Sequence, residues 1–215
     1  MLIVGSIKLP ESEVPKLGMG DIRRRQLVEA AIAVIGEHGF HEATVQQIAR
    51  RAGLSAGLVA HYFDDKEGLL EATLRALADE LGQELVQAFS RAPDPMARVR
   101  AVIEVCLSPR QFEPTLARVW LAFWHRSLHS ERLGRIQRVY QRRIYDNLLH
   151  ALRPLVPATV APRLAETAAS LIDGVWLRST LAEPAFGSRS ARSAVLQAVE
   201  TLIEAHALPA ARAAS

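Results

Sequence analysis

The chain has 215 residues, 49% of them hydrophobic, and a formal net charge of +3. A chain this apolar can build a core, which excludes general disorder. The sequence contains no run of about 18 consecutive apolar residues, so a membrane span is not indicated. The single cysteine, Cys106, excludes a disulfide scaffold and a Cys-ligated zinc site and fits the reducing interior of a cytoplasmic protein.

Apolar residues recur at helical spacing nearly throughout the chain, whereas the alternation typical of strands is scarce. The sequence therefore predicts an all-α fold of about nine helices. The first helices are expected over residues 21–38, from Thr44 to Gly53, from Ser55 onward, and from Asp64 or Asp65 to about Phe89.

Proline-containing stretches divide the second part of the chain. "RAPDP" at 91–95 breaks the helical pattern most clearly and is the clearest candidate for a boundary. The last two long helices are expected at about 158–181 and 188–205. Their apolar faces predict a four-helix bundle with a second copy of the chain, and hence a homodimer.

The stretch "TVQQIARRAGLSAGLVAHYF" at 44–63 predicts two short helices joined by a tight turn. Ala49 and Gly53 are four residues apart, which would let the helices cross closely, and Ile48 and Val59 would hold the crossing. This is the pattern of a helix-turn-helix, whose second helix can enter the major groove of DNA. The alternative is an ordinary tight turn in an α-bundle.

Three arginines, Arg23, Arg24 and Arg25, are expected near the start of the first helix, where cations oppose the helix dipole. Placing them there suggests contacts to the DNA backbone or minor groove. Thr44 begins the second helix, whose free amides could receive a phosphate. The alternative for the arginines is a solvated surface.

The motif T-V-Q-Q-I-A-x-x-A-G-L-S-x-G-x-x-x-x-Y-F-x-x-K-x-x-L-L resembles the N-terminal signature of the TetR family of transcriptional repressors. The resemblance implies a homodimer bound to a near-palindromic double-stranded DNA operator. Ser55, Ala56, Gly57, Leu58 and His61 would face the groove. Thr44, Tyr62 and Lys66 would hold the DNA backbone.

The resemblance also implies a domain organisation. The expected parts are an extension at 1–13 that is disordered, a DNA-binding head at 14–67 with its helix-turn-helix at 44–63, an effector-binding and dimerisation body at 68–207, and a flexible tail at 208–215.

Within that family, "PKLGM", "IRRRQL", "WLAFW" and "LIDGVWLR" are similar to the BetI-type group. Members of this group respond to choline and control genes of glycine betaine synthesis. The resemblance implies a quaternary amine, choline or betaine aldehyde, as the effector. A regulator of another amine or of an efflux pathway remains an alternative, as does a helical enzyme or scaffold that does not bind DNA.

Aromatic residues gather in two places in the second part of the chain. Trp120, Phe123 and Trp124 share one helical face, and Asp173 and Trp176 share another. A carboxylate in an apolar helix is costly to bury unpaired, but together with aromatic walls it suits a quaternary ammonium group. Tyr140 and Tyr145 are possible further walls.

The alternative is an ordinary aromatic core in which Asp173 pairs with Arg178 or Arg126.

His125 and His129 are four residues apart but lack a third ligand, so no metal is expected. Catalytic motifs and phosphate-binding glycine loops are also missing from the sequence. The sequence therefore predicts no cofactor and no enzymatic activity.

Overall fold

A computed structural model describes residues 18–182 and 187–207. Within these ranges the chain forms nine α-helices, one short 3-10 helix and no strand, which confirms the all-α prediction. The predicted extension at 1–13 and tail at 208–215 lie outside the described residues. Among the helices described, none is long and apolar enough to cross a bilayer.

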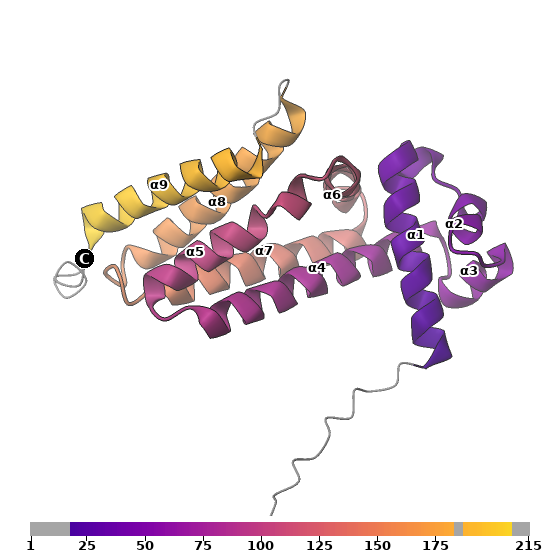
Figure 1. The fold of residues 1–215 in the computed structure, drawn as a ribbon, viewed down its shortest axis with the longest axis horizontal. Coiled ribbons are helices and arrows are strands. Elements are labelled where there is room, and N and C mark those ends of the chain that lie inside the picture. Colours follow the sequence, from indigo (N-terminus) through magenta and orange to yellow (C-terminus); the bar gives the residue numbers. More distant parts are fainter. Residues whose placement is uncertain (1–17, 183–186, 208–215) are drawn as a thin grey trace, which may run out of the picture.

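Figure 1 shows a long helical body with a smaller group of helices packed against one end. The elements in chain order are α1 (Met19–Glu42), α2 (Val45–Arg51), α3 (Ala56–Tyr62), α4 (Lys66–Arg91), α5 (Pro95–Cys106), η1 (Pro109–Phe112), α6 (Pro114–Ser127), α7 (Glu131–Leu152), α8 (Ala161–Leu181) and α9 (Ser188–His206). We call α1–α3 the head and α4–α9 the body.

The two short helices of the head are capped as the sequence predicts. Thr44 and Gln47 form a reciprocal capping box at α2, and the Ser55 side chain accepts a hydrogen bond from the Leu58 amide at α3. Ile48 and Val59 are 1% and 2% exposed, so they hold the crossing of the two helices. Both short helices are thus fixed by caps and burial rather than by length.

The role expected for Gly53 is wrong. It does not stack above Ala49 on a helix face, because α2 ends at Arg51 and Gly53 has a φ of 67° in the turn that follows. A Cβ at Gly53 would meet no atom within 4 Å. Glycine is therefore favoured here by the left-handed backbone rather than by the close approach of two helices.

The position expected for the three arginines also needs correction. Helix α1 begins at Met19, so Arg23–Arg25 lie beyond its first turn. The dipole of a helix acts mainly within its first turn, so it does not disfavour arginines at these positions. Their place in the helix is therefore no indication of DNA contacts. At the other end of α1, Gly39 leaves helical geometry with a φ of 78°, and the prediction that the regular helix closes there is confirmed.

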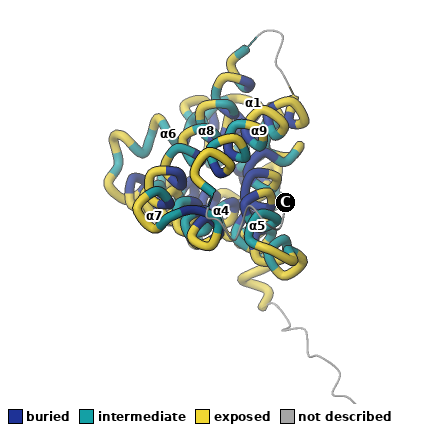
Figure 2. The backbone as a smooth tube through the Cα atoms, turned by 90° about the vertical axis from the view of Figure 1, so that its left-hand side faces the viewer, coloured by how far each residue is buried: buried dark blue, intermediate teal, exposed yellow. Residues whose placement is uncertain are grey.

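Helices α4, α5, α7, α8 and α9 run side by side in the body, and their buried residues face one another while the outer turns are exposed (Figures 1 and 2). Asp65, rather than Asp64, caps α4 by accepting from the Gly68 amide. The "RAPDP" stretch is a turn between α4 and α5, and Asp94 caps α5. The partly buried apolar residues of α8 and α9 that pack against the core are Ala169, Leu171, Val175, Leu177, Leu196 and Leu202.

Candidate functional site

The outward face of α3 is open to solvent. Ser55, Ala56, Gly57 and His61 are exposed, and Leu58 is half-buried. A Cβ at Gly57 would meet only the Ser55 hydroxyl, at 4.0 Å. Packing within the protein therefore does not demand glycine at this position, and the bare backbone of Gly57 can approach another molecule closely.

Lys66 lies where the head meets the body. Its Nζ donates a hydrogen bond to the His41 carbonyl at 3.0 Å and lies 4.4 Å from the centroid of the Phe40 ring. Burial lowers the pKa of Lys66, and the nearby Glu42 carboxylate opposes that shift. An ammonium group keeps further N–H donors after one such bond, so Lys66 can hold the end of α1 and retain donors for another partner.

The three arginines of α1 have different surroundings. Arg23 donates to the Gln26 side chain at 3.3 Å, and Arg24 lies 5.0 Å from the centroid of the Phe63 ring. Arg25 is exposed. Tyr62 is half-buried, and its hydroxyl would lie 3.9 Å from a Cβ at Gly20, so it lies near the start of α1.

The aromatic residues predicted from two separate helices meet around one cavity in the body. Its lining residues are Cys106, Gln111, Trp120, Trp124, Tyr140, Ile172, Asp173 and Trp176. We call this set the cage. The ring centroids of Trp124 and Trp176 are 5.1 Å apart with their planes at 65°, and those of Trp120 and Tyr140 are 5.2 Å apart.

Gln111 of η1 orients two of the cage tryptophans. Its side-chain oxygen accepts from Trp120 Nε1 at 3.1 Å, and its backbone carbonyl accepts from Trp176 Nε1 at 2.8 Å. Trp124 Nε1 is buried without a hydrogen-bond partner among the described residues. Two indoles are therefore fixed, and the third has an unused donor.

Asp173 supplies the only carboxylate of the cage. Burial raises its pKa to about 6, so the group remains charged at neutral pH. None of the described residues gives it a hydrogen bond or an ion pair. Arg126, one partner considered from the sequence, instead lies 3.7 Å from Glu67, and Arg178 is exposed.

Two of the predicted aromatic residues lie outside the cage. Phe123 is 1% exposed and lies behind Trp120, with their ring centroids 6.0 Å apart. It supports the wall without lining the cavity. Tyr145 lines a different groove between α7 and α8. The cage is completed by Cys106, Gln111 and Ile172, which the sequence pattern does not assign to it.

The cage is nearly closed in this conformation. Its volume is about 20 Å³, enough for one water molecule. A trimethylammonium group fits only if the rings separate. Because Trp120 and Trp124 belong to α6 while Asp173 and Trp176 belong to α8, a ligand that pushes Trp124 away from Trp176 would displace these two helices relative to each other.

Helix α6 also contacts the head. Its first turn packs on α1 at Gly36, where an added Cβ would lie 2.7 Å from the Thr115 carbonyl oxygen and 2.9 Å from Thr115 Cα. Arg118 of α6 donates to the Gly36 carbonyl at 3.0 Å. The helix that carries two cage tryptophans is therefore packed directly on the helix that supports the head.

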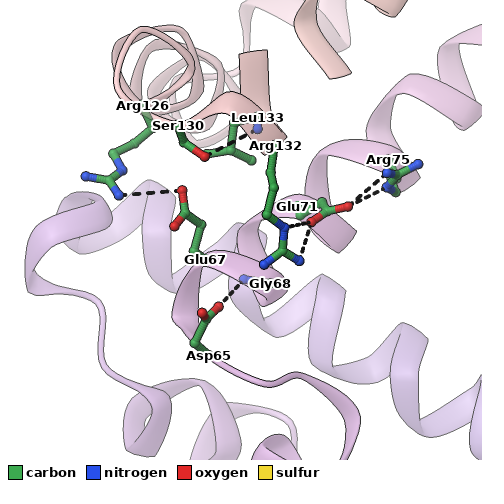
Figure 3. Close-up of polar contacts among 9 residues, drawn as sticks. All are labelled: Asp65, Glu67, Gly68, Glu71, Arg75, Arg126, Ser130, Arg132 and Leu133. Carbon is green, nitrogen blue, oxygen red and sulfur yellow. Dashed lines mark hydrogen bonds and ion pairs between the residues drawn. The ribbon is translucent and has the colours of Figure 1, made fainter. Parts of the chain in front are cut away.

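A second contact joins the end of α6 to the start of α4 (Figure 3). The Arg126 guanidinium lies 3.7 Å from Glu67 and 5.4 Å from the Phe40 ring centroid. Beside it, Glu71 accepts hydrogen bonds from Arg75 and Arg132 at 2.8 and 2.9 Å. Burial alone would raise the pKa of Glu71, but these bonds outweigh it and lower that pKa.

A helix-turn-helix head on a helical body with an internal cavity defines the class of ligand-responsive bacterial transcriptional repressors. Residues 27–73 match the family model of bacterial regulatory proteins of the tetR family, and residues 95–204 match that of the BetI-type transcriptional repressor, C-terminal. The chain belongs to the TetR family of DNA-binding repressors, in its BetI-type group. Regulators of this family bind operator DNA, dimerise and bind small-molecule effectors.

Curated relatives agree with this assignment. The chain is 46% identical over 180 residues to the HTH-type transcriptional regulator BetI of Yersinia pestis (strain Pestoides F), covering 83% of this chain and 91% of the relative. It is 40% identical over 198 residues to the regulator of the same name from Serratia proteamaculans (strain 568), covering 91% and 100%. The family is one of transcriptional regulators rather than enzymes.

Solved structures share the fold. A transcriptional regulator from Pseudomonas aeruginosa PAO1 superposes with a TM-score of 0.74 at 28% identity, covering 90% of this chain and 97% of that one. A regulator from Saccharomonospora viridis, solved in complex with choline, gives a TM-score of 0.75 at 21% identity, covering 82% and 95%. At that identity the second likeness establishes the fold alone.

Proposed function

We propose that this repressor senses choline or betaine aldehyde and controls genes that convert choline to glycine betaine. One observation carries the proposal: the Asp173 carboxylate, which has no partner among the described residues, faces a cavity walled by all three tryptophans of the chain and by Tyr140. Aromatic faces attract a quaternary ammonium group, and a single acid balances its charge. A neutral ligand would leave Asp173 buried and uncompensated, which is unfavourable.

The comparisons support the proposal in two ways. The curated relatives carry the name BetI over most of the chain. The regulator from Saccharomonospora viridis, which has the same fold, was solved in complex with choline. Neither identifies the effector of this chain, so the proposal depends on the chemistry of the cage.

The mechanism that we propose couples the cage to the head through α6. A ligand that separates Trp124 from Trp176 displaces α6 relative to α8, and α6 packs on α1 at Gly36 and contacts α4 through Arg126. In a dimer, two recognition helices must stand about 34 Å apart to meet successive major grooves. A ligand that favours another spacing weakens operator binding.

We also propose how the head divides its contacts with DNA. The exposed face of α3, with Ser55, Ala56, Gly57, Leu58 and His61, would read base edges. The contacts to phosphates would come from the DNA-binding residues outside that face, Arg23, Arg24, Arg25, Thr44, Tyr62 and Lys66. This division has measurable consequences, because phosphate contacts depend on salt whereas base contacts determine the preferred sequence.

Substitutions at His61 and Arg25 are expected to separate these two kinds of contact. His61→Ala should weaken operator binding by about 1–3 kcal/mol and leave binding to unrelated DNA unchanged, because only a base contact is lost. Arg25→Gln should weaken binding to both DNAs and lower the slope of log K against log salt by about 1. Fluorescence anisotropy at several salt concentrations measures both effects.

Arg91→Gln is the matched control, since Arg91 is exposed at the end of α4 far from the head (Figure 1). It should leave both the affinity and the salt slope unchanged. An equal loss on both DNAs for His61→Ala would contradict a role in reading bases.

The proposed function is tested by titrating choline, betaine aldehyde and glycine betaine into the complex with DNA from upstream of the gene, at fixed salt. Specific binding that choline or the aldehyde relieves is the expected result. If the protein binds this DNA specifically but none of the three compounds changes the binding, the proposed class of effector is wrong and only the repressor function stands.

A further inference from the structure

The nearly closed cage raises the question of how a ligand reaches it. Two open grooves and one adjoining hollow on the body each share one wall residue with the cage. The larger groove, about 830 Å³, lies between α4 and α7 and shares Tyr140; the smaller groove, about 390 Å³, lies between α7 and α8 and shares Asp173. A ligand that enters through either groove must displace the shared residue.

Tyr140 is the better suited of the two to move. It lines the cage, the α4/α7 groove and the adjoining hollow beside Val139. Its side chain turns about two torsions, and its ring rests against Trp120 with the planes at 34°. Asp173, in contrast, supplies the charge that holds the proposed ligand, so it must stay in place while the ligand enters.

We propose that the α4/α7 groove is the entrance for the small organic cation and that Tyr140 is the movable wall between groove and cage. This inference rests on the proposed effector site. When the Tyr140 ring swings toward the groove, the space beside Trp120 opens and the two cavities join.

The α4/α7 groove fits this role. Leu81, Leu85 and Ile144 are at most 5% exposed and form an apolar floor, against which the methyl groups of a small organic cation can pack. Among the described residues, one ion pair spans the groove from α7 to α4, between Arg143 and Asp79 at 3.8 Å. Its side chains are 61% and 69% exposed, so the pair contributes little and opens readily.

Cys106 provides a direct reporter of access, because it is the single cysteine of the chain and lines the cage. The probe is 2-(trimethylammonium)ethyl methanethiosulfonate, which carries a quaternary ammonium group. Its sulfenyl sulfur forms a disulfide with Cys106, methanesulfinate leaves, and the thiol proton goes to solvent. Burial raises the pKa of Cys106 to about 12, so labelling is slow and rates are compared at one pH.

Gly82 allows the groove to be blocked without touching the cage. It lines the α4/α7 groove, and a Cβ added there would meet no atom within 4 Å. We expect Gly82→Trp to slow labelling of Cys106 at least tenfold and Tyr140→Ala to accelerate it at least tenfold. Ala76→Trp, at an exposed site of the same helix that lines neither groove, should leave the rate unchanged. Intact-mass spectrometry follows the reaction.

The competing route is tested by Ser170→Trp, since Ser170 lines the α7/α8 groove. Wild-type labelling in Gly82→Trp with slow labelling in Ser170→Trp would overturn the proposal. If Gly82→Trp fails to fold by circular dichroism, Gly82→Leu repeats the test, because leucine favours a helix more than glycine does.

Protection of Cys106 by choline tests the effector site separately from the entrance. In the wild-type protein, choline should slow labelling of Cys106. Protection by choline together with a wild-type labelling rate in Gly82→Trp would reject the entrance and leave the cage as the effector site. No protection by choline would reject the cage, and the entrance with it.

Discussion

Asp173→Asn is expected to weaken the choline response strongly while operator binding persists. Asp173 is the only acid of the cage and has no partner among the described residues, so it is free to balance the charge of a ligand. Removing one partner of a desolvated charge pair costs about 2–5 kcal/mol. Choline affinity should therefore fall by about 30-fold or more, as measured by isothermal titration calorimetry.

The pH dependence of choline binding has a defined sign. Burial raises the pKa of Asp173 to about 6, so protonation below that pH removes the charge that a cation needs. Choline affinity of the wild-type protein should fall as the pH drops through about 6, approaching tenfold per pH unit below it. The Asp173→Asn variant should lack this dependence.

The same substitution should stabilise the ligand-free protein. Because the pKa of Asp173 is higher in the folded state, the folded protein binds more protons between about pH 4 and 6, and stability falls as the pH rises through that range. At neutral pH, Asp173→Asn should raise the free energy of unfolding by about 1–3 kcal/mol. Glu166→Gln, at an exposed carboxylate of the same helix, is the control and should change neither stability nor choline affinity. Wild-type choline affinity in Asp173→Asn would contradict the account.

Gly36→Ala is expected to destabilise the protein, whereas Gly82→Ala should stabilise it. Both glycines lie inside long helices, where alanine is favoured by about 1 kcal/mol. At Gly82 the new methyl group meets open space. At Gly36 it would collide with the backbone of Thr115, so α1 and α6 must separate. Overpacking of this kind costs about 1–3 kcal/mol and can cost more.

Urea denaturation of the two variants measures these opposite shifts. Because Gly36 lies where α6 meets the head, Gly36→Ala should also change how strongly choline alters operator affinity, and Gly82→Ala should not. Equal stabilisation by both alanines would show that α1 and α6 do not need this close approach.

Local sequence rules explain much of the fold. The capping residues Thr44 and Ser55 mark helix starts, and Ile48 and Val59 are apolar at the spacing that buries them. The function of Gly53 was harder to predict. A glycine can serve close packing or a left-handed backbone, and spacing alone does not distinguish these two uses.

The cage could be predicted only in part. Helical spacing places Trp120 beside Trp124, and Asp173 beside Trp176, because each pair lies on one helix. Spacing does not reveal that α6 and α8 face each other, nor that η1 brings Gln111 to two of the indoles. Cys106 and Gln111 carry no pattern that marks them, since their positions depend on the tertiary packing of α5, η1 and α7.

Phe123 illustrates the limit of the same rule. It shares a face with Trp120 and Trp124 at helical spacing, yet its ring lies behind Trp120 in the core. A helical face is wider than one cavity wall, so neighbours on that face can be either lining or support. Only the position of α8 decides between them.

Intrinsic tryptophan fluorescence reports directly on a ligand in the cage, because all three tryptophans of the chain line it. The measurement is a titration with choline and with 3,3-dimethylbutan-1-ol, its uncharged isostere, at pH 7.5. We expect a saturable fluorescence change with choline, an affinity for choline about 30-fold or more weaker in Asp173→Asn, and little response to the alcohol. An equal response to both compounds, or no response to choline, would contradict recognition of a quaternary ammonium group by this cage.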